Sequence, residues 1–255
     1  YIYEDGFQER CAKIIQSLDG GYVICGQQRS LGSGSGGFSD VLFIKTDSNG
    51  LLEWTQTYGG DGYQFGFDVL SLADGGYLVV GENDNKPYLL KIDSVGTELW
   101  STTYSQMASS SANSVKQTVF GNYIITGWVN SNGSNETDIF IIKADSLGNI
   151  MWVQNYGDNT TSEGGLGIEV SNDGGYVVCA NKKPAGEGDS TYDIFVVKTD
   201  IDGNVLWEQT YGNGDKDIAR EIKKTNDGGY ILVGDTRSFI QTDNDDDIYL
   251  LKINS

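Results

Sequence analysis

Carboxylates alternate with other residues in an acidic string near the C-terminal end of the chain. Asp243, Asp245 and Asp247 have the one-residue spacing that calcium loops use, and carboxylate oxygens are the donors that this cation prefers. The string lacks the downstream Gly and Glu of an EF-hand. The sequence therefore leaves two interpretations open, a calcium site and a solvated acidic loop.

Four aromatic residues have the chemistry of a binding site. Trp128 is the one Trp outside a position that recurs along the chain, and Tyr63, Phe65 and Tyr192 fall in comparable segments. Aromatic faces stack on sugar rings and anchor protein partners. We expect these side chains to bind a glycan or a protein, and local packing beneath a loop is the alternative.

Two acidic residues are the candidates for catalysis. Asp68 and Glu221 occupy equivalent places in two different repeats, and glycosidases use such a pair of carboxylates. The chain contains no His, which removes the commonest general base and the commonest zinc ligand. A glycoside hydrolase is therefore an alternative, and a protein without catalytic activity is the prediction.

Three Asn-x-Ser/Thr triplets are candidate glycosylation sites. They begin at Asn132, Asn135 and Asn159. If the host glycosylates its proteins, the chain is a glycoprotein at these positions.

These residues are set in a repeat that occurs five times. Asp-Gly-Gly-Tyr ends at Tyr22, Tyr77, Tyr176 and Tyr230, and Phe-Gly-Asn-Tyr ends at Tyr123. Each copy precedes two apolar runs, the second of which ends in a lysine: Lys45, Lys91, Lys143, Lys198 and Lys252. A period of this size, built from short strand-like segments, is typical of β-propellers.

Each repeat predicts four antiparallel strands. The second and third strands are almost continuously apolar, which indicates burial on both faces. The fold class that we predict is therefore all-β, a five-bladed β-propeller in one domain. Its blades cover approximately residues 7–58, 62–104, 110–156, 164–211, and 217–255 together with 1–4.

The fifth repeat ends before its fourth strand. Tyr3 stands nineteen residues before Tyr22, the interval that separates Tyr58 from Tyr77. We therefore expect the N-terminal strand to complete the last blade and close the ring. The alternatives are a longer parent protein and a strand donated by a neighbouring molecule.

The turns carry two further motifs. The two glycines of each Asp-Gly-Gly corner are expected to supply positive φ angles. The second motif is Asp-x-x-Gly-x-x-x-Trp, for example Asp47, Gly50 and Trp54. We expect the Asp side chain to cap its own turn, the Gly to adopt the left-handed conformation and the Trp to fold back as a large packing element. Lys45 and Asp47 point the same way on one strand, which predicts that they pair and that the lysine stem packs on Trp.

The combined pattern D-G-G-Y…K-x-D-x-x-G-x-x-x-W-x-x-x-Y-G resembles that of secreted bacterial and archaeal repeat proteins with propeller-like domains. It is reminiscent of the Asp box of sialidase-type propellers, but each copy is one residue longer on both sides of the Gly. The resemblance implies an extracellular or cell-surface location and supplies no catalytic residues.

The composition of the chain argues against two classes of partner, nucleic acids and the membrane interior. A net charge of −19 argues against nucleic acid, and no apolar run is long enough to insert into a membrane. The start at Tyr1 without Met leads us to expect a mature or trimmed product. Sequence variation concentrates in 27–39, 128–137, 181–191 and 235–246, on the loops between second and third strands, which share one face of a propeller with those joining one blade to the next.

The predicted function is that of an acidic, exported protein- or glycan-interaction module, or a structural building block of a surface assembly. We expect the protein to act through this loop face. Self-association of the protein is compatible with this prediction. No cofactor is expected beyond possible calcium. A lectin-like propeller is the second hypothesis, and the glycoside hydrolase is the third.

Overall fold

The computed structural model describes residues 8–29, 38–130, 136–158, 160–184, 187–188, 191–213, 215–238 and 246–254. These residues form β-strands joined by turns and loops, with no α-helix among them. Within the described part there is accordingly no helix that could cross a membrane. The chain divides into two compact units, residues 1–112 and 113–255, and each unit is described by itself.

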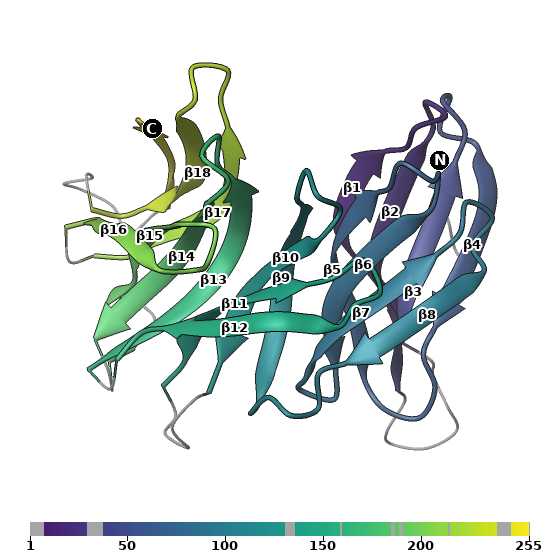
Figure 1. Cartoon of the computed structure of the whole chain (residues 1–255), viewed down its shortest axis with the longest axis horizontal. Helices are drawn as coiled ribbons and strands as arrows, with labels where there is room; N and C mark the ends of the chain where they lie inside the picture. Colours follow the sequence, from purple (N-terminus) through teal and green to yellow (C-terminus); the bar gives the residue numbers. More distant parts are fainter. Residues whose placement is uncertain are drawn as a thin grey trace. The chain divides into compact units, whose positions relative to one another are not determined.

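Nineteen described strands form five antiparallel sheets that follow one another along the chain (Figure 1). Sheet 1 contains β1 (Gln8–Gln16), β2 (Tyr22–Arg29), β3 (Ser39–Thr46) and β4 (Leu52–Tyr58). Sheet 2 contains β5 (Gln64–Ser71), β6 (Tyr77–Asn83), β7 (Pro87–Ile92) and β8 (Glu98–Thr103). Sheet 3 contains β9 (Ser110–Gln117), β10 (Tyr123–Val129), β11 (Asp138–Ala144) and β12 (Ile150–Tyr156).

The two remaining sheets lie in the second unit. Sheet 4 contains β13 (Thr161–Val170), β14 (Tyr176–Pro184), β15 (Asp193–Thr199) and β16 (Val205–Tyr211). Sheet 5 has three described strands, β17 (Asp217–Lys224), β18 (Tyr230–Thr236) and β19 (Asp247–Ile253). The predicted all-β class and the antiparallel four-stranded repeat are confirmed. The predicted closing strand falls in residues 1–7, outside the described residues.

Sheet 4 shows why its second and third strands are continuously apolar. Tyr176 and Val178 pack with residues of sheet 3, whereas Val177 and Cys179 pack with residues of sheet 5. Successive side chains on a strand point to opposite faces, so both faces of sheet 4 are buried against a neighbouring sheet. The predicted burial of both faces is confirmed for this sheet.

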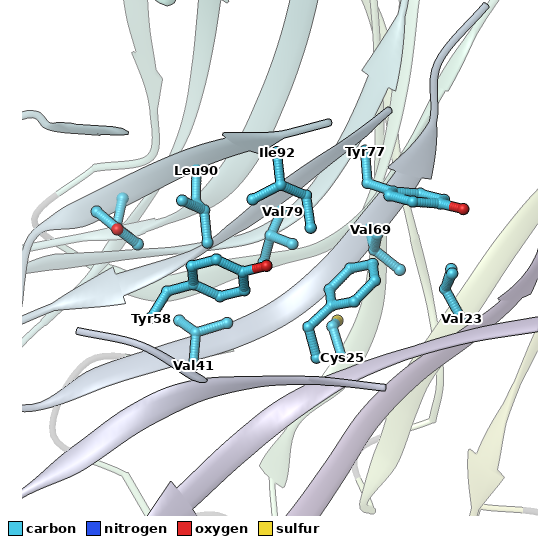
Figure 2. Packing of buried hydrophobic residues seen from close by; sticks show 11 residues of the cluster. Val23, Cys25, Val41, Tyr58, Val69, Tyr77, Val79, Leu90 and Ile92 are labelled. Atoms are coloured by element: carbon cyan, nitrogen blue, oxygen red, sulfur yellow. The ribbon is translucent and has the colours of Figure 1, made fainter. Parts of the chain in front are cut away.

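In the first unit, sheets 1 and 2 pack face to face in the same way (Figure 2). Sheet 1 contributes Val23, Cys25 and Val41, and sheet 2 contributes Val79 and Leu90. All five side chains are fully buried. The core of this unit is therefore the layer between two sheets.

Two junctions between sheets also have a directional contact. The Tyr58 hydroxyl of sheet 1 donates a hydrogen bond of 2.6 Å to the carbonyl oxygen of Gly96 in sheet 2. The Trp54 ring lies so close to Gly96 that an added Cβ would be 3.0 Å from it. In the second unit, Tyr156 donates in the same way to Gly203, at 2.7 Å, and Trp152 approaches that glycine. The repeated Trp and Tyr thus fasten one sheet to the next.

The two glycines of each corner have different roles, which corrects the prediction that both supply a positive φ. Gly20 has a φ of +87°, whereas Gly21 is not among the positive-φ residues. A Cβ on Gly21 would lie 2.1 Å from the Thr46 carbonyl oxygen and 2.7 Å from Lys45 Nζ. The second glycine is therefore needed for close approach of the neighbouring strand.

A β-bulge recurs in the first strand of four sheets. The pairing register shifts at Ala12, Phe67, Leu166 and Arg220. Each of these residues directly follows a small residue of its strand: Cys11, Gly66, Gly165 and Ala219, respectively. A bulge re-aims the neighbouring side chains and strengthens the local twist.

The outward faces of the first and last sheets differ from their counterparts. Ile248 and Leu250 of β19 are 82% and 65% exposed, whereas Ile194 and Val196, at the same positions of sheet 4, are fully buried. In sheet 1, Ile14 is 56% exposed. An apolar face is therefore exposed on sheet 5, whereas on sheet 1 the residues Leu42 and Ile44, which share the face of Ile14, are buried.

Gly96→Ala is expected to lower the free energy of unfolding by at least about 1–2 kcal/mol, because an L-residue is strained at positive φ. The new Cβ would also press on the Trp54 ring. Chemical denaturation measures the change. Gly60→Ala is the matched control, since a Cβ there meets nothing within 4 Å. Equal stabilities of the two variants would contradict this account of the junction.

Candidate functional site

Four aromatic rings follow one another at the start of β5, and we call them the aromatic ladder: Phe38, Tyr63, Phe65 and Phe67. The centroids of Tyr63 and Phe65 are 6.4 Å apart with ring planes at 20°, and those of Phe65 and Phe67 are 6.1 Å apart at 16°. Phe38 meets Tyr63 edge to face at 5.9 Å. Phe38 and Tyr63 are exposed, so the ladder presents aromatic surface to solvent.

The backbone holds the exposed end of the ladder firmly. Ser39 and Tyr63 form a parallel β-bridge. The Tyr63 N–H donates to Asp84 Oδ1 at 2.9 Å, and the Asp84 N–H donates to the Tyr63 carbonyl oxygen at 3.0 Å. Asp84 and Asn85 adopt positive φ angles of 48° and 61° in the turn between β6 and β7. Asp and Asn tolerate this conformation better than other non-glycine residues.

The ladder is specific to one repeat. At the position of Phe65 the other repeats carry Arg10, Ser111, Gly164 and Ile218. At the position of Phe67 they carry Ala12, Asn113, Leu166 and Arg220. The rings are therefore not needed to build a sheet of this type.

The structure brings together two of the four predicted binding residues, Tyr63 and Phe65. Trp128 and Tyr192 lie in the second unit, on and beside sheets 3 and 4, and are half-buried. Lys183 Nζ lies 4.9 Å from the centroid of the Tyr192 ring. One face of that ring is thus already occupied by a cation.

Most residues of the other predicted sites lie outside the described residues: Asp243, Asp245, Asn132, Asn135 and Asn159. Asp247 is described, and it begins β19 opposite Thr236. The adjacent Asp246 forms ion pairs with Lys216 at 3.5 Å and Arg237 at 2.5 Å. Among the described residues, no three His, Cys, Asp or Glu side chains gather as a potential metal site.

The two candidate catalytic acids have local partners. Asp68 is buried, and its Oδ1 accepts the Val69 N–H at 3.0 Å. Glu221 lies 2.8 Å from Lys223 Nζ. These residues belong to different units.

The repeated lysines pair with the Asp of the Asp-Gly-Gly corner. Lys45 Nζ lies 2.8 Å from Asp19 Oδ2, and the same pairing joins Lys91 to Asp74, Lys198 to Asp173 and Lys252 to Asp227, each at 2.9 Å. The predicted partner Asp47 is instead occupied by its own turn, where its Oδ1 accepts the N–H groups of Asn49 and Leu51 at 2.8 Å. The expected Lys45–Asp47 pair is therefore wrong, and the expected capping of the turn by Asp47 is confirmed.

The third repeat is a natural exception to this pairing. Phe120 replaces the Asp and Asn122 replaces the second Gly of the corner. Lys143 then lies about equally far from two rings, with its Nζ 6.0 Å from the Trp152 centroid and 5.9 Å from that of Tyr176. Of the four repeats that contain both this lysine and the strand Trp, the third is the one for which the described structure shows a cation–π contact between them.

The ion pairs change the acidity of the corner carboxyls. The Lys45 hydrogen bond holds the pKa of Asp19 well below its usual range, and the Lys91 hydrogen bond lowers that of Asp74. At Asp173, partial burial opposes the shift, but hydrogen bonds from Lys198 and Gly175 lower the pKa to about 2. These carboxylates therefore stabilise the fold only while they are ionised.

No family model matches the sequence, and no curated protein matches it. Solved structures do resemble it. A Bacteroides caccae protein of unknown function has a TM-score of 0.58 at 12% identity, covering 93% of this chain and 74% of its own. The Neurospora crassa Pan2 WD40 domain has a TM-score of 0.59 at 14% identity, covering 96% and 63%.

An enzyme is among the similar structures as well. The β-1,2-mannobiose phosphorylase from Listeria innocua has a TM-score of 0.54 at 11% identity, covering 100% of this chain and 92% of its own. WD40 domains are β-propellers. These likenesses support a propeller-like fold and do not transfer an activity, because propellers host unrelated functions.

The corner ion pairs predict acid sensitivity. Asp173 has a pKa of about 2 in the folded protein, below the value of about 3.9 for an unfolded chain, so its stabilisation is present above pH 4 and lost as the pH falls towards 2. Lys198→Met should reduce the fall in unfolding free energy between pH 5 and pH 2.5. The difference should stay below about 1 kcal/mol, because the carboxylate is exposed.

Lys143→Met is the matched control, since Lys143 has no corner carboxylate in its repeat. Urea denaturation across this pH range measures both variants against the unsubstituted protein. If Lys143→Met altered the pH dependence as much as Lys198→Met, the acid sensitivity would have another origin.

Proposed function

We propose that this chain is an exported, non-catalytic β-propeller that recognises a glycan or a protein partner at the cell surface. The propeller-like neighbours support the architecture. The one observation that carries the function is the aromatic ladder, because it is exposed, rigidly held and absent from the other repeats.

The chemistry around the ladder favours a glycan. Parallel aromatic faces stack on the apolar faces of sugar rings. Asp84 lies beside Tyr63 and is exposed, so its carboxylate is placed to accept hydrogen bonds from hydroxyl groups. A protein partner would use the same rings as anchors.

The finer architecture in this proposal is a closed five-bladed ring. Sheet 5 lacks a fourth described strand, and residues 1–4 have the spacing of the missing strand. The apolar faces of sheets 1 and 5 would then cover one another, as the equivalent faces do at the junctions within each unit. Closure would also remove the exposed sheet edge, which otherwise invites aggregation.

A glycan array tests the function directly. Tyr63→Ala combined with Phe65→Ala is expected to weaken binding at least about fivefold, since each stacked ring contributes roughly 0.5–1.5 kcal/mol. Phe120→Ala is the control, because Phe120 is an exposed aromatic in a corner turn, outside the ladder. Retained binding by the double variant would overturn the role of the ladder.

Two further outcomes separate the alternative functions. Release of reducing sugar from a bound glycan would replace this proposal with a glycoside hydrolase. Concentration-dependent assembly in analytical ultracentrifugation, lost in the double variant, would identify a structural building block whose partner is a second copy.

Ring closure predicts that Ile248→Asp is strongly destabilising. Burying a charge in an apolar layer without a partner is costly, so we expect a loss of at least about 2–3 kcal/mol in unfolding free energy. Leu206→Asp is the control, because Leu206 lies exposed on the outer strand β16. A change within about 0.5 kcal/mol for Ile248→Asp, the usual range for exposed positions, would contradict closure.

A further inference from the structure

Two carboxylates lie beside the aromatic ladder in sheet 2. Phe65 of β5 stands directly opposite Glu82 of β6 in the antiparallel register, so the two side chains point to the same face of the sheet. Asp84 follows Glu82 by two residues and accepts the Tyr63 N–H at 2.9 Å. A row of rings flanked by negative charge suits a ligand that has both an apolar surface and a positive charge.

The chain does not neutralise these two carboxylates. Among the residues that the structure describes, neither Glu82 nor Asp84 forms an ion pair. The Glu82 carboxylate accepts hydrogen bonds from the Ser111 hydroxyl and the Asn85 N–H, which are both uncharged, and partial burial raises the pKa of Glu82. A carboxylate that is partly withdrawn from water in this way is stabilised by a cation.

Sheet 5 shows how the chain itself compensates a carboxylate at this position. Asp235 takes the position of Glu82, and Arg220 takes that of Phe67, at the same β-bulge. Arg220 Nε donates to Asp235 Oδ2 at 2.7 Å, and the arginine side chain remains 59% exposed. Side chains at these two positions therefore meet at a place that water reaches, and a cation fits there.

The other repeats place no carboxylate opposite the first strand at this point. They carry Gln27, Trp128 and Asn181 in the position of Glu82. Sheet 2 is thus the repeat that combines this carboxylate with an aromatic ring, Phe67, where sheet 5 has its arginine. The face of an aromatic ring attracts a cation, and Lys182 Nζ lies 4.4 Å from the centroid of the Phe195 ring elsewhere in the chain.

We propose that the glycan bound by the aromatic ladder is an amino sugar polymer with free amino groups. One ammonium lies over the Phe67 ring and pairs with Glu82, in the place that the Arg220 guanidinium takes in sheet 5. The apolar faces of the neighbouring sugar rings stack on the ladder, and Asp84 adds a second negative charge beside Tyr63. This inference rests on the proposed function and adds the chemical class of the ligand. A lysine-rich protein segment offers the charge without the flat apolar faces that a row of near-parallel rings selects.

Calorimetry with two matched oligosaccharides tests the ligand class. The full chain is titrated with a β-1,4-linked glucosamine hexamer and with the same hexamer fully N-acetylated, which lacks the positive charges. We expect the glucosamine hexamer to bind at least about fivefold more tightly, because the contact with the ring and the ion pair both require a cation. Equal affinities, or tighter binding of the acetylated hexamer, would overturn this inference and leave the proposed function standing. Binding that does not depend on Tyr63 and Phe65 would overturn both.

The chain supplies the design of the decisive variants. Glu82→Gln is expected to lower the preference for the glucosamine hexamer to about twofold or less, because the charge of the ion pair is lost while the amide oxygen still accepts the Ser111 hydroxyl. Phe67→Arg copies the Arg220–Asp235 pair of sheet 5, so an internal guanidinium should replace the ligand ammonium and abolish the preference. Glu208→Gln is the matched control, because it makes the same chemical change at an exposed position of β16, and it should keep the full preference.

Two measurements on the unsubstituted protein keep the test valid if a variant fails to fold. The preference should shrink in 1 M sodium chloride, since salt screens an ion pair at a partly exposed site. A preference that is unchanged by salt, or by Glu82→Gln in a folded variant, would contradict the role of Glu82. A hexalysine peptide should bind more weakly than the glucosamine hexamer. Tighter binding of the peptide would replace the amino sugar with a basic protein partner.

Discussion

Packing of one sheet on the next is the interaction on which the rest of this structure depends. A four-stranded sheet whose middle strands are apolar on both faces has no stable form alone, since each face must leave water. Sheet 4 meets this need with a neighbour on each face. The Trp and Tyr of the last strand then fix the distance to the next sheet, because they contact a glycine that has no side chain to displace.

The repeated residues are therefore used for architecture, and we propose that function falls to residues that do not repeat. The corner Asp and the strand Lys neutralise each other, and the Asp of the second turn binds its own backbone. The aromatic ladder is a departure from the repeat, and it lies where sheet 1 passes to sheet 2.

Sequence reasoning predicted the strands and their pairing order because apolar runs and Gly corners report burial and turns directly. It predicted two members of the ladder and missed Phe38 and Phe67, since a bridge to Ser39 and a bulge at Phe67 leave no local pattern. It also gave Lys45 the wrong partner. Proximity along one strand suggested Asp47, but the turn amides compete for that carboxylate. The replacement of the corner Asp by Phe120 in the third repeat was a sequence signal that could have identified the corner Asp as the partner of the lysine.

Hydrogen exchange of β1 and β19 tests most directly whether every sheet is stabilised by like neighbours on both faces. In a closed ring, the amides of Gln8–Gln16 and Asp247–Ile253 should exchange within about tenfold of those of β15, because local opening of buried sheets approaches global unfolding. Exchange of β19 many orders of magnitude faster than β15 would show that the last sheet has an open edge and an uncovered face, and would contradict the account.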